Sequence, residues 1–151
     1  MPLRVLVLCT GNSCRSQMAE ALLRRAGGGE LSVFSAGTHP TAVNPLTIRA
    51  LAEVGLDIRA ARSKPMTQLL DQPFYVVVTV CDDAREACPV FPGDGRRVHV
   101  PFVDPALAVG DEEARLAVFR QVRDGIAAWA EPFAARLVAG ADAAHTAAGL
   151  R

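Results

Sequence analysis

The feature that most constrains the fold is a seven-residue polar segment that joins an apolar run to a helical pattern. Residues 3–8 are apolar except for Arg4, which predicts a buried strand, and residues 16–26 have a helical pattern. The segment between them, residues 9–15, reads Cys-Thr-Gly-Asn-Ser-Cys-Arg. Free N–H groups and the helix dipole favour an anion at such a strand-to-helix junction. The sequence therefore predicts an anion-binding loop at residues 9–15.

Two side chains give this loop its chemistry. The Arg15 guanidinium and the free N–H groups should favour the thiolate form of Cys9, which would place a nucleophile at the base of an oxyanion cradle. Gly11 and Asn12 suit a loop that needs unusual backbone angles. The ordinary alternative is a buried cysteine at a strand end, but the elements on both sides favour the functional interpretation. The predicted oxyanion-binding residues are Thr10, Gly11, Asn12, Ser13, Cys14 and Arg15.

Strand and helix patterns alternate along the rest of the chain. The predicted strands are residues 3–8, 31–36, 74–80 and 97–100, and the predicted helices are residues 16–26, 44–55, a short one after Pro65 and a last one from 111. Pro132 should kink or end the last helix. This order predicts the α/β class, as a single-domain, open, parallel four-stranded sheet flanked by helices.

Composition and charge limit the partners of the chain. Lys+Arg and Asp+Glu number 16 each, so there is no overall basic field for nucleic acid. No apolar stretch is long enough to span a membrane. We expect a cytoplasmic monomer that binds neither nucleic acid nor membranes. The domain is expected to span residues 1–137, and the Ala-rich residues 138–151 are expected to form a flexible C-terminal tail.

The cysteines at positions 9, 14, 81 and 88 leave several interpretations open. They could form two structural disulfides, but in a cytosolic chain cysteines more often serve catalysis or metal binding. Zinc is disfavoured, because the C-x4-C and C-x6-C spacings match common zinc sites poorly. Cys9, Cys81 and Asp104 each follow a predicted strand, and ligands bind beyond the carboxyl ends of parallel strands. We therefore expect these three side chains to converge on one site.

A set of motifs spread along the chain matches one known family. The motifs are residues 7–20 (VLCTGNSCRSQMAE), Ser35-Ala36-Gly37, Val43-Asn44-Pro45, residues 78–81 (VTVC), Cys88-Pro89 and Asp104-Pro105. With them the chain resembles the arsenate reductases of the low-molecular-weight protein tyrosine phosphatase superfamily. Cys81 and Cys88 make it similar to the thioredoxin-coupled branch in particular. The resemblance implies the low-molecular-weight phosphatase-like fold.

The resemblance also implies how an arsenate ion would react. Cys9 would attack arsenic as the nucleophile while Arg15 binds the oxygens of the anion. Ser16 would donate a hydrogen bond to the Cys9 thiolate. Asp104 would act as the general acid that protonates the departing oxygen. An Asp-Pro step is also a common start of a turn, which is the ordinary interpretation of Asp104.

A relay of thiols would complete the reduction of arsenate to arsenite in the family that the chain resembles. Cys81 would attack the Cys9 sulfur and release arsenite, and Cys88 would then attack Cys81. The resulting Cys81–Cys88 disulfide would be reduced by external thioredoxin, and no bound cofactor or metal is implied. Phosphate or sulfate would compete with arsenate for the cradle. Cys14 has no place in the relay and is assigned a structural role.

Two other functions remain open. A low-molecular-weight protein tyrosine phosphatase would share Cys9, Arg15, Ser16 and Asp104. Such enzymes usually carry aromatic residues after the Asp-Pro step, where this chain has Ala106 and Leu107. Weak phosphatase activity is expected as a side reaction. A thiol redox sensor is the second alternative, although it would leave Arg15 and Asp104 without a purpose.

A departure from the family pattern concerns potassium. Some members bind this cation beside the anion loop, and Asn12, Glu20 and Ser35 match that site. The position that usually carries an aspartate is Lys64, the only lysine in the chain. We hypothesise that its ammonium takes the place of the cation and pairs with Glu20. A solvated surface lysine is the ordinary alternative.

Overall fold

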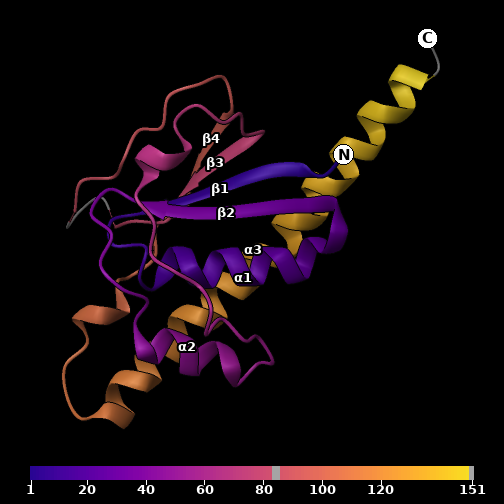
Figure 1. Ribbon diagram of the computed structural model, residues 1–151. Helices are drawn as coiled ribbons and strands as arrows, with labels where there is room; N and C mark the ends of the chain where they lie inside the picture. The colour runs from indigo at the N-terminus through magenta and orange to yellow at the C-terminus, as the bar shows by residue number, and fades with distance from the viewer. Residues whose placement is uncertain (83–85, 150–151) are drawn as a thin grey trace.

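The computed structural model describes the backbone of residues 1–82 and 86–149 and the side chains of residues 1–82 and 86–140. Four parallel strands form one sheet in the order β2-β1-β3-β4 (Figure 1). They are β1 (Leu3–Cys9), β2 (Leu31–Gly37), β3 (Val76–Thr79) and β4 (Arg96–His99). The predicted α/β class and the four-stranded parallel sheet are therefore confirmed.

Three α-helices lie against one face of this sheet (Figure 1). They are α1 (Arg15–Gly27), α2 (Pro45–Ala52) and α3 (Glu112–Gly149). The described chain also has three short 3-10 helices, η1 (Gly28–Glu30), η2 (Met66–Leu69) and η3 (Pro105–Leu107). Asn44 begins α2 as predicted, because its Oδ1 accepts a hydrogen bond from the Leu46 N–H at 2.9 Å. The short helix expected after Pro65 is the 3-10 helix η2.

Side chains of β1 alternate between two buried clusters, which explains why its sequence is continuously apolar. Val5, Val7 and Cys9 belong to the larger cluster, which lies between the sheet and the three helices. Leu6 and Leu8 belong to a second cluster on the opposite face. That second cluster contains Ala36, Phe74, Val77 and Phe91, with Phe34, Met66 and Leu69 packed against it. Cys9 therefore ends β1 on the face that carries α1.

Pro132, which the sequence predicts to kink or end the last helix, lies inside α3 and does not end it. Buried side chains on both sides of the proline, Ile126 and Ala130 before it and Phe133 and Ala134 after it, hold both halves against the core. This packing stabilises the helix despite the hydrogen bond that proline removes. The helix also runs across the expected domain boundary at residue 137 to Gly149, and residues 150–151 lie outside the described residues. The flexible tail stays a prediction.

The length of α3 raises the question of whether a helix of this chain could cross a membrane. None of the described helices combines the length and the apolarity that crossing a membrane requires.

Candidate active site

The sheet register brings two of the cysteines to neighbouring strand ends. Leu8 of β1 pairs with Thr79 of β3, and the Val80 N–H donates to the Leu8 carbonyl at 3.0 Å. Cys9 directly follows Leu8, and Cys81 directly follows Val80. Both cysteines therefore lie at the carboxyl edge of the sheet, next to the start of α1.

Ser16 orients a hydrogen bond toward the sulfur of Cys9. The Cys9 Sγ and Ser16 Oγ atoms lie 2.8 Å apart, and both residues are buried. The Asn12 Nδ2 group donates to the same Ser16 oxygen at 2.8 Å. Because the serine oxygen accepts from Asn12, its single hydrogen is available to the sulfur. A thiolate at Cys9 would receive this bond, as expected for Ser16.

Asn12 is the residue that holds the loop to the rest of the site. Its φ of 48° lies in the left-handed region, which asparagine tolerates better than most residues. Besides Ser16, its Nδ2 donates to Ser35 at 3.0 Å, and its Oδ1 accepts from the Lys64 N–H at 2.9 Å and from Gln17 Nε2 at 3.2 Å. One fully buried side chain thus joins the loop to β2, α1 and the segment before η2.

The backbone of the loop leaves its N–H groups free. The carbonyls of Thr10, Gly11 and Ser13 accept hydrogen bonds from N–H groups of residues 39, 41 and 44. The N–H groups of residues 11–14, by contrast, donate to no acceptor among the described residues. A row of unpaired N–H groups before a helix N-terminus is what an oxyanion needs.

Arg15 is buried at 3% exposure and forms an ion pair with Glu86, a residue to which the sequence assigned no role. Nη1 of Arg15 contacts Oε1 of Glu86, and Nη2 donates to Oε2 at 3.1 Å. Thr10 Oγ1 donates to Oε2 at 2.5 Å, and the Asp82 N–H donates to Oε1 at 2.7 Å. Because Glu86 is 71 residues from Arg15 and lies in an irregular segment, no local pattern could have indicated it.

The charges of this pair follow from its surroundings. Burial raises the pKa of Glu86, but the hydrogen bonds from Arg15, Thr10 and Asp82 lower it by more than burial raises it. The net effect is a pKa of about 2, compared with the usual 4.5. Burial lowers the pKa of Arg15, and the hydrogen bonds to Glu86 outweigh that effect and raise it. The contribution of Glu86 to stability is therefore complete above pH 4.5 and is lost as the pH falls through about 2.

Cys81 and Cys88 form a disulfide bond, so the structure is that of the oxidised relay pair. Cys81 is buried, and the remaining cysteines, Cys9 and Cys14, are free thiols. Burial raises the pKa of the Cys14 thiol, which suits the structural role assigned to it. The pairing implied for the last step of the relay is confirmed.

His99 lies beside this disulfide, although the sequence assigned no histidine to the site. Ligand atoms of Cys81, Cys88 and His99 all lie within 4.8 Å of one another. The His99 Nδ1 is 2.7 Å from Thr79 Oγ1, which orients the ring. These residues could hold a soft metal ion only after reduction, because a metal binds thiolates and not disulfide sulfurs.

Asp104 begins a turn, as the ordinary interpretation predicts, and its carboxyl group also lies close to Arg15. Its Oδ1 accepts from the Ala106 N–H at 3.0 Å, so it begins the 3-10 turn η3. Its Oδ2 lies 3.7 Å from Nη2 of Arg15. The turn therefore presents a carboxyl group at the anion loop, where a general acid would be needed.

The predicted pairing of Lys64 with Glu20 is wrong as a direct ion pair. Glu20 contacts Arg24 at 3.3 Å, one helical turn away, and the Lys64 Nζ donates to the Arg62 carbonyl at 2.8 Å. Burial lowers the pKa of Lys64, and the nearby Glu20 carboxylate opposes that effect. That the Lys64 ammonium takes the place of the cation near Glu20, without a direct ion pair, therefore stays a prediction.

This hypothesis predicts that the protein binds inorganic phosphate with the same affinity in potassium and in sodium chloride. The Lys64→Asp variant, which introduces the carboxylate found in other members, should bind phosphate more tightly in potassium. Lys64→Gln removes the ammonium without adding a carboxylate and serves as the control. Isothermal titration in the two salts measures both effects, and a marked preference of the wild type for potassium would contradict the hypothesis.

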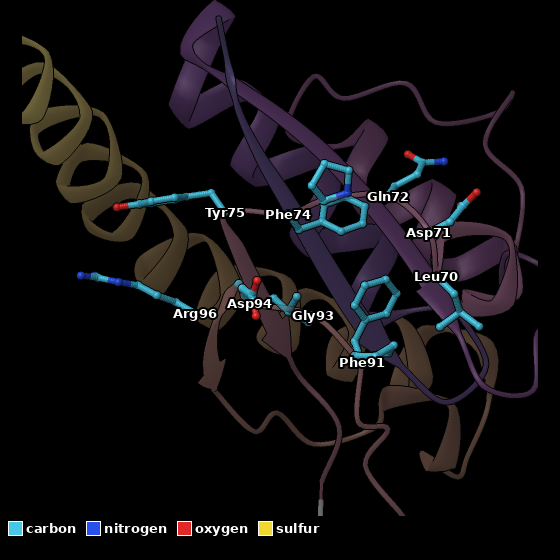
Figure 2. Close-up of a pocket in the computed structure, with 13 residues that line it drawn as sticks. Leu70, Asp71, Gln72, Phe74, Tyr75, Phe91, Gly93, Asp94 and Arg96 are labelled. Carbon is cyan, nitrogen blue, oxygen red and sulfur yellow. The ribbon is translucent and has the colours of Figure 1, made fainter.

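The described residues form several cavities, and two of them need to be compared with the position of the loop. A cavity of about 620 Å³ is lined by residues 70–75 and 91–96 on the face of the second cluster, where Phe74 and Phe91 point toward each other (Figure 2). It contains none of the predicted site residues. A cavity of about 480 Å³ is lined by Asp82, Glu86, Val103, Asp104, Leu107, Ala108 and Val118. The smaller of these two cavities therefore belongs to the candidate site.

These features define a class of protein: an α/β fold that places a buried cysteine and a loop of free N–H groups between its first strand and the helix α1. A family model for the low-molecular-weight phosphotyrosine protein phosphatases matches residues 4–141. The chain belongs to the low-molecular-weight phosphotyrosine protein phosphatase family.

Curated relatives in this family include several arsenate reductases. The arsenate reductase of Halalkalibacterium halodurans is 46% identical over 127 residues, which are 84% of this chain and 91% of the relative. The arsenate reductase of Bacillus subtilis is 44% identical over 119 residues, which are 79% and 86% of the two chains.

Solved structures are similar as well. An arsenate reductase in the phosphate-binding state matches with a TM-score of 0.70 and 28% identity, over 89% of this chain and 98% of the other. A thioredoxin-dependent arsenate reductase of Corynebacterium glutamicum matches with a TM-score of 0.59 and 30% identity, over 83% of this chain and 59% of the other.

Proposed function

We propose that this protein reduces arsenate to arsenite and is recycled by thioredoxin. The observation that carries the proposal is the Cys81–Cys88 disulfide, which lies at the end of the strand next to Cys9. A phosphatase has no use for a second and third thiol at this position, whereas a thiol relay requires both. The relatives named arsenate reductase support the same conclusion.

The first step would be a substitution at arsenic. The Cys9 thiolate, held by the hydrogen bond from Ser16, attacks arsenate in the cradle formed by the free N–H groups and Arg15. Asp104 protonates the departing oxygen, which leaves as water. The product is a covalent thiol–arsenate adduct in which arsenic is still pentavalent.

The second step would move two electrons from sulfur to arsenic, and the third would exchange one disulfide for another. The Cys81 thiolate attacks the Cys9 sulfur, the sulfur–arsenic bond breaks, and its electron pair stays on arsenic, which leaves as trivalent arsenite. The Cys88 thiolate then attacks Cys81 and releases the Cys9 thiolate. The disulfide of the structure corresponds to the end of this sequence.

External thioredoxin would supply the two electrons that reopen the disulfide. Exposed apolar side chains in this region suit a protein partner. Val90, at 75% exposure, lies two residues after Cys88, and Val103 and Leu107 line the smaller cavity together with Asp82, the residue after Cys81. This coupling would place the protein in the cytoplasm, where thioredoxin keeps thiols reduced.

Arsenate-dependent oxidation of NADPH by thioredoxin reductase and thioredoxin tests the proposal. The wild type should turn over, and Cys81→Ser and Cys88→Ser should not. Cys88→Ser should still release one arsenite per protein and stop at a Cys9–Cys81 disulfide, which mass spectrometry detects, whereas Cys81→Ser should form no disulfide.

Hydrolysis of an aryl phosphate serves as the control, because it needs the cradle and Cys9 but neither relay cysteine. Both serine variants should keep any weak hydrolysis that the wild type has. If the wild type fails to reduce arsenate and hydrolyses the aryl phosphate regardless of Cys81, the protein is a phosphatase and the proposal fails.

A further inference from the structure

The carboxylate of Glu86 lies where a substrate oxyanion would bind. We propose that Glu86 is a positioning residue that excludes anions from the loop while the Cys81–Cys88 disulfide is closed, and releases the loop when the disulfide is reduced. This inference rests on the proposed thiol relay and adds an order to it: thioredoxin first, then the anion.

The contacts of Glu86 are those of a bound anion. Its two oxygens face the two terminal nitrogens of Arg15, in the paired geometry by which a guanidinium binds carboxylate or phosphate. A hydroxyl donor, Thr10 Oγ1, and a backbone donor, the Asp82 N–H, complete four hydrogen bonds. The Arg15 terminal nitrogens and Thr10 belong to the same loop that would hold arsenate. Both anions therefore cannot occupy these donors together.

The disulfide places Glu86 in this position. Glu86 lies two residues before Cys88, and its Oε1 accepts from the N–H of Asp82, the residue after Cys81. The cross-link therefore holds both chain segments that carry the carboxylate and its backbone donor. Reduction would remove that constraint and increase the conformational freedom of the segment, so Glu86 would dock on Arg15 less favourably.

The consequence concerns a dead-end adduct. If Cys9 attacked arsenate while Cys81 and Cys88 were still joined, no thiol would be available to resolve the adduct. A carboxylate docked on Arg15 in the oxidised form prevents that attack, because the anion cannot bind. Glu86 would thus make each turnover wait for thioredoxin.

The coupling must act in both directions. If closing the disulfide weakens the binding of an anion by a given factor, then a saturating anion favours the reduced form by the same factor. A tenfold effect corresponds to a rise of about 30 mV in the reduction potential of the disulfide.

Inorganic phosphate is the probe, and calorimetric titration of the oxidised and the reduced protein is the experiment. Reduced wild type should bind phosphate at least about tenfold more tightly than oxidised wild type. Glu86→Ala should bind phosphate equally in both forms. Glu86→Gln keeps the shape but loses the charge, so its difference in phosphate affinity between the two forms should lie between those of the wild type and Glu86→Ala. Glu30→Gln removes an exposed carboxylate at the opposite end of the sheet and should behave as the wild type. Thiol titration checks that each oxidised sample has only Cys9 and Cys14 free.

Equal phosphate affinity in the two forms of the wild type would overturn the inference, and so would a redox difference that survives in Glu86→Ala. The potential of the disulfide, measured in thiol buffers with and without phosphate, gives a second test that should move in the wild type and not in Glu86→Ala. Neither measurement involves arsenate. A protein that passes both but does not reduce arsenate would therefore refute the proposed function and leave the role of Glu86 intact.

Discussion

Replacing Arg15 with lysine is expected to lower kcat/KM for arsenate by about 10²- to 10³-fold, the effect of removing one strong donor from an oxyanion site. Lysine keeps the charge but cannot present two parallel N–H groups to an anion. The buried position of Arg15 and its ion pair with Glu86 indicate that this geometry matters here. The thioredoxin-coupled assay measures the loss, and phosphate titration of the reduced variant measures its binding component.

Arg136→Lys is the matched control, because Arg136 is an exposed arginine of α3. It should change neither turnover nor phosphate affinity. If Arg15→Lys retained most of its turnover, positive charge alone would suffice, and the paired geometry seen with Glu86 would not represent how the loop binds its substrate.

Asn12→Ala is expected to lower the free energy of unfolding by about 3 kcal/mol, because several buried polar groups lose their partner and alanine is disfavoured at positive φ. The affected groups are Ser16, Ser35, Gln17 and the Lys64 N–H. Turnover should fall with stability, since Ser16 loses the donor that directs its hydrogen toward Cys9. Urea unfolding of the reduced protein measures the first effect, and the coupled assay measures the second.

Asn44→Ala makes the same chemical change at the start of α2 and should cost only about 1 kcal/mol, the usual value for a helix cap. Asn12→Gly separates the two causes, because glycine adopts the same φ without penalty but still lacks the side chain. If Asn12→Gly were as stable as the wild type, the hydrogen bonds of Asn12 would contribute little and the backbone conformation would explain the whole effect.

The sequence predicts most of the fold because its signals are local. The apolar run of β1, the loop and the helix α1 follow one another directly, so their order determines the anion site. Predictions fail where distant packing decides. Strand β3 is shorter than its apolar run, since Phe74 is buried in the second cluster outside the ladder. Distant packing also decides between the two outcomes expected at Pro132, because the core holds both sides of the proline and α3 does not end there.

The candidate site divides in the same way. Cys9, Ser16 and Arg15 lie within eight residues of the chain, and their arrangement follows from strand, loop and helix. Glu86 lies outside the described helices and strands, and its contact with Arg15 spans 71 residues, so no periodic pattern could indicate it. The direct ion pair of Lys64 with Glu20 is not formed, because Arg24 lies one turn from Glu20 on α1 and contacts it, while the Lys64 Nζ donates to the Arg62 carbonyl.

The alternation of side chains along β1 has a consequence for how this site can change in evolution. Cys9 reaches the helix side of the sheet because it shares its parity with Val5 and Val7, which are buried there. A one-residue insertion or deletion within β1 would turn the sulfur to the face of Leu6 and Leu8, away from α1 and its N–H groups. Length changes in this strand are therefore tolerable only in pairs of residues. The number of residues in β1 before Cys9 is thus constrained as strictly as the nucleophile itself, although these residues take no part in the chemistry.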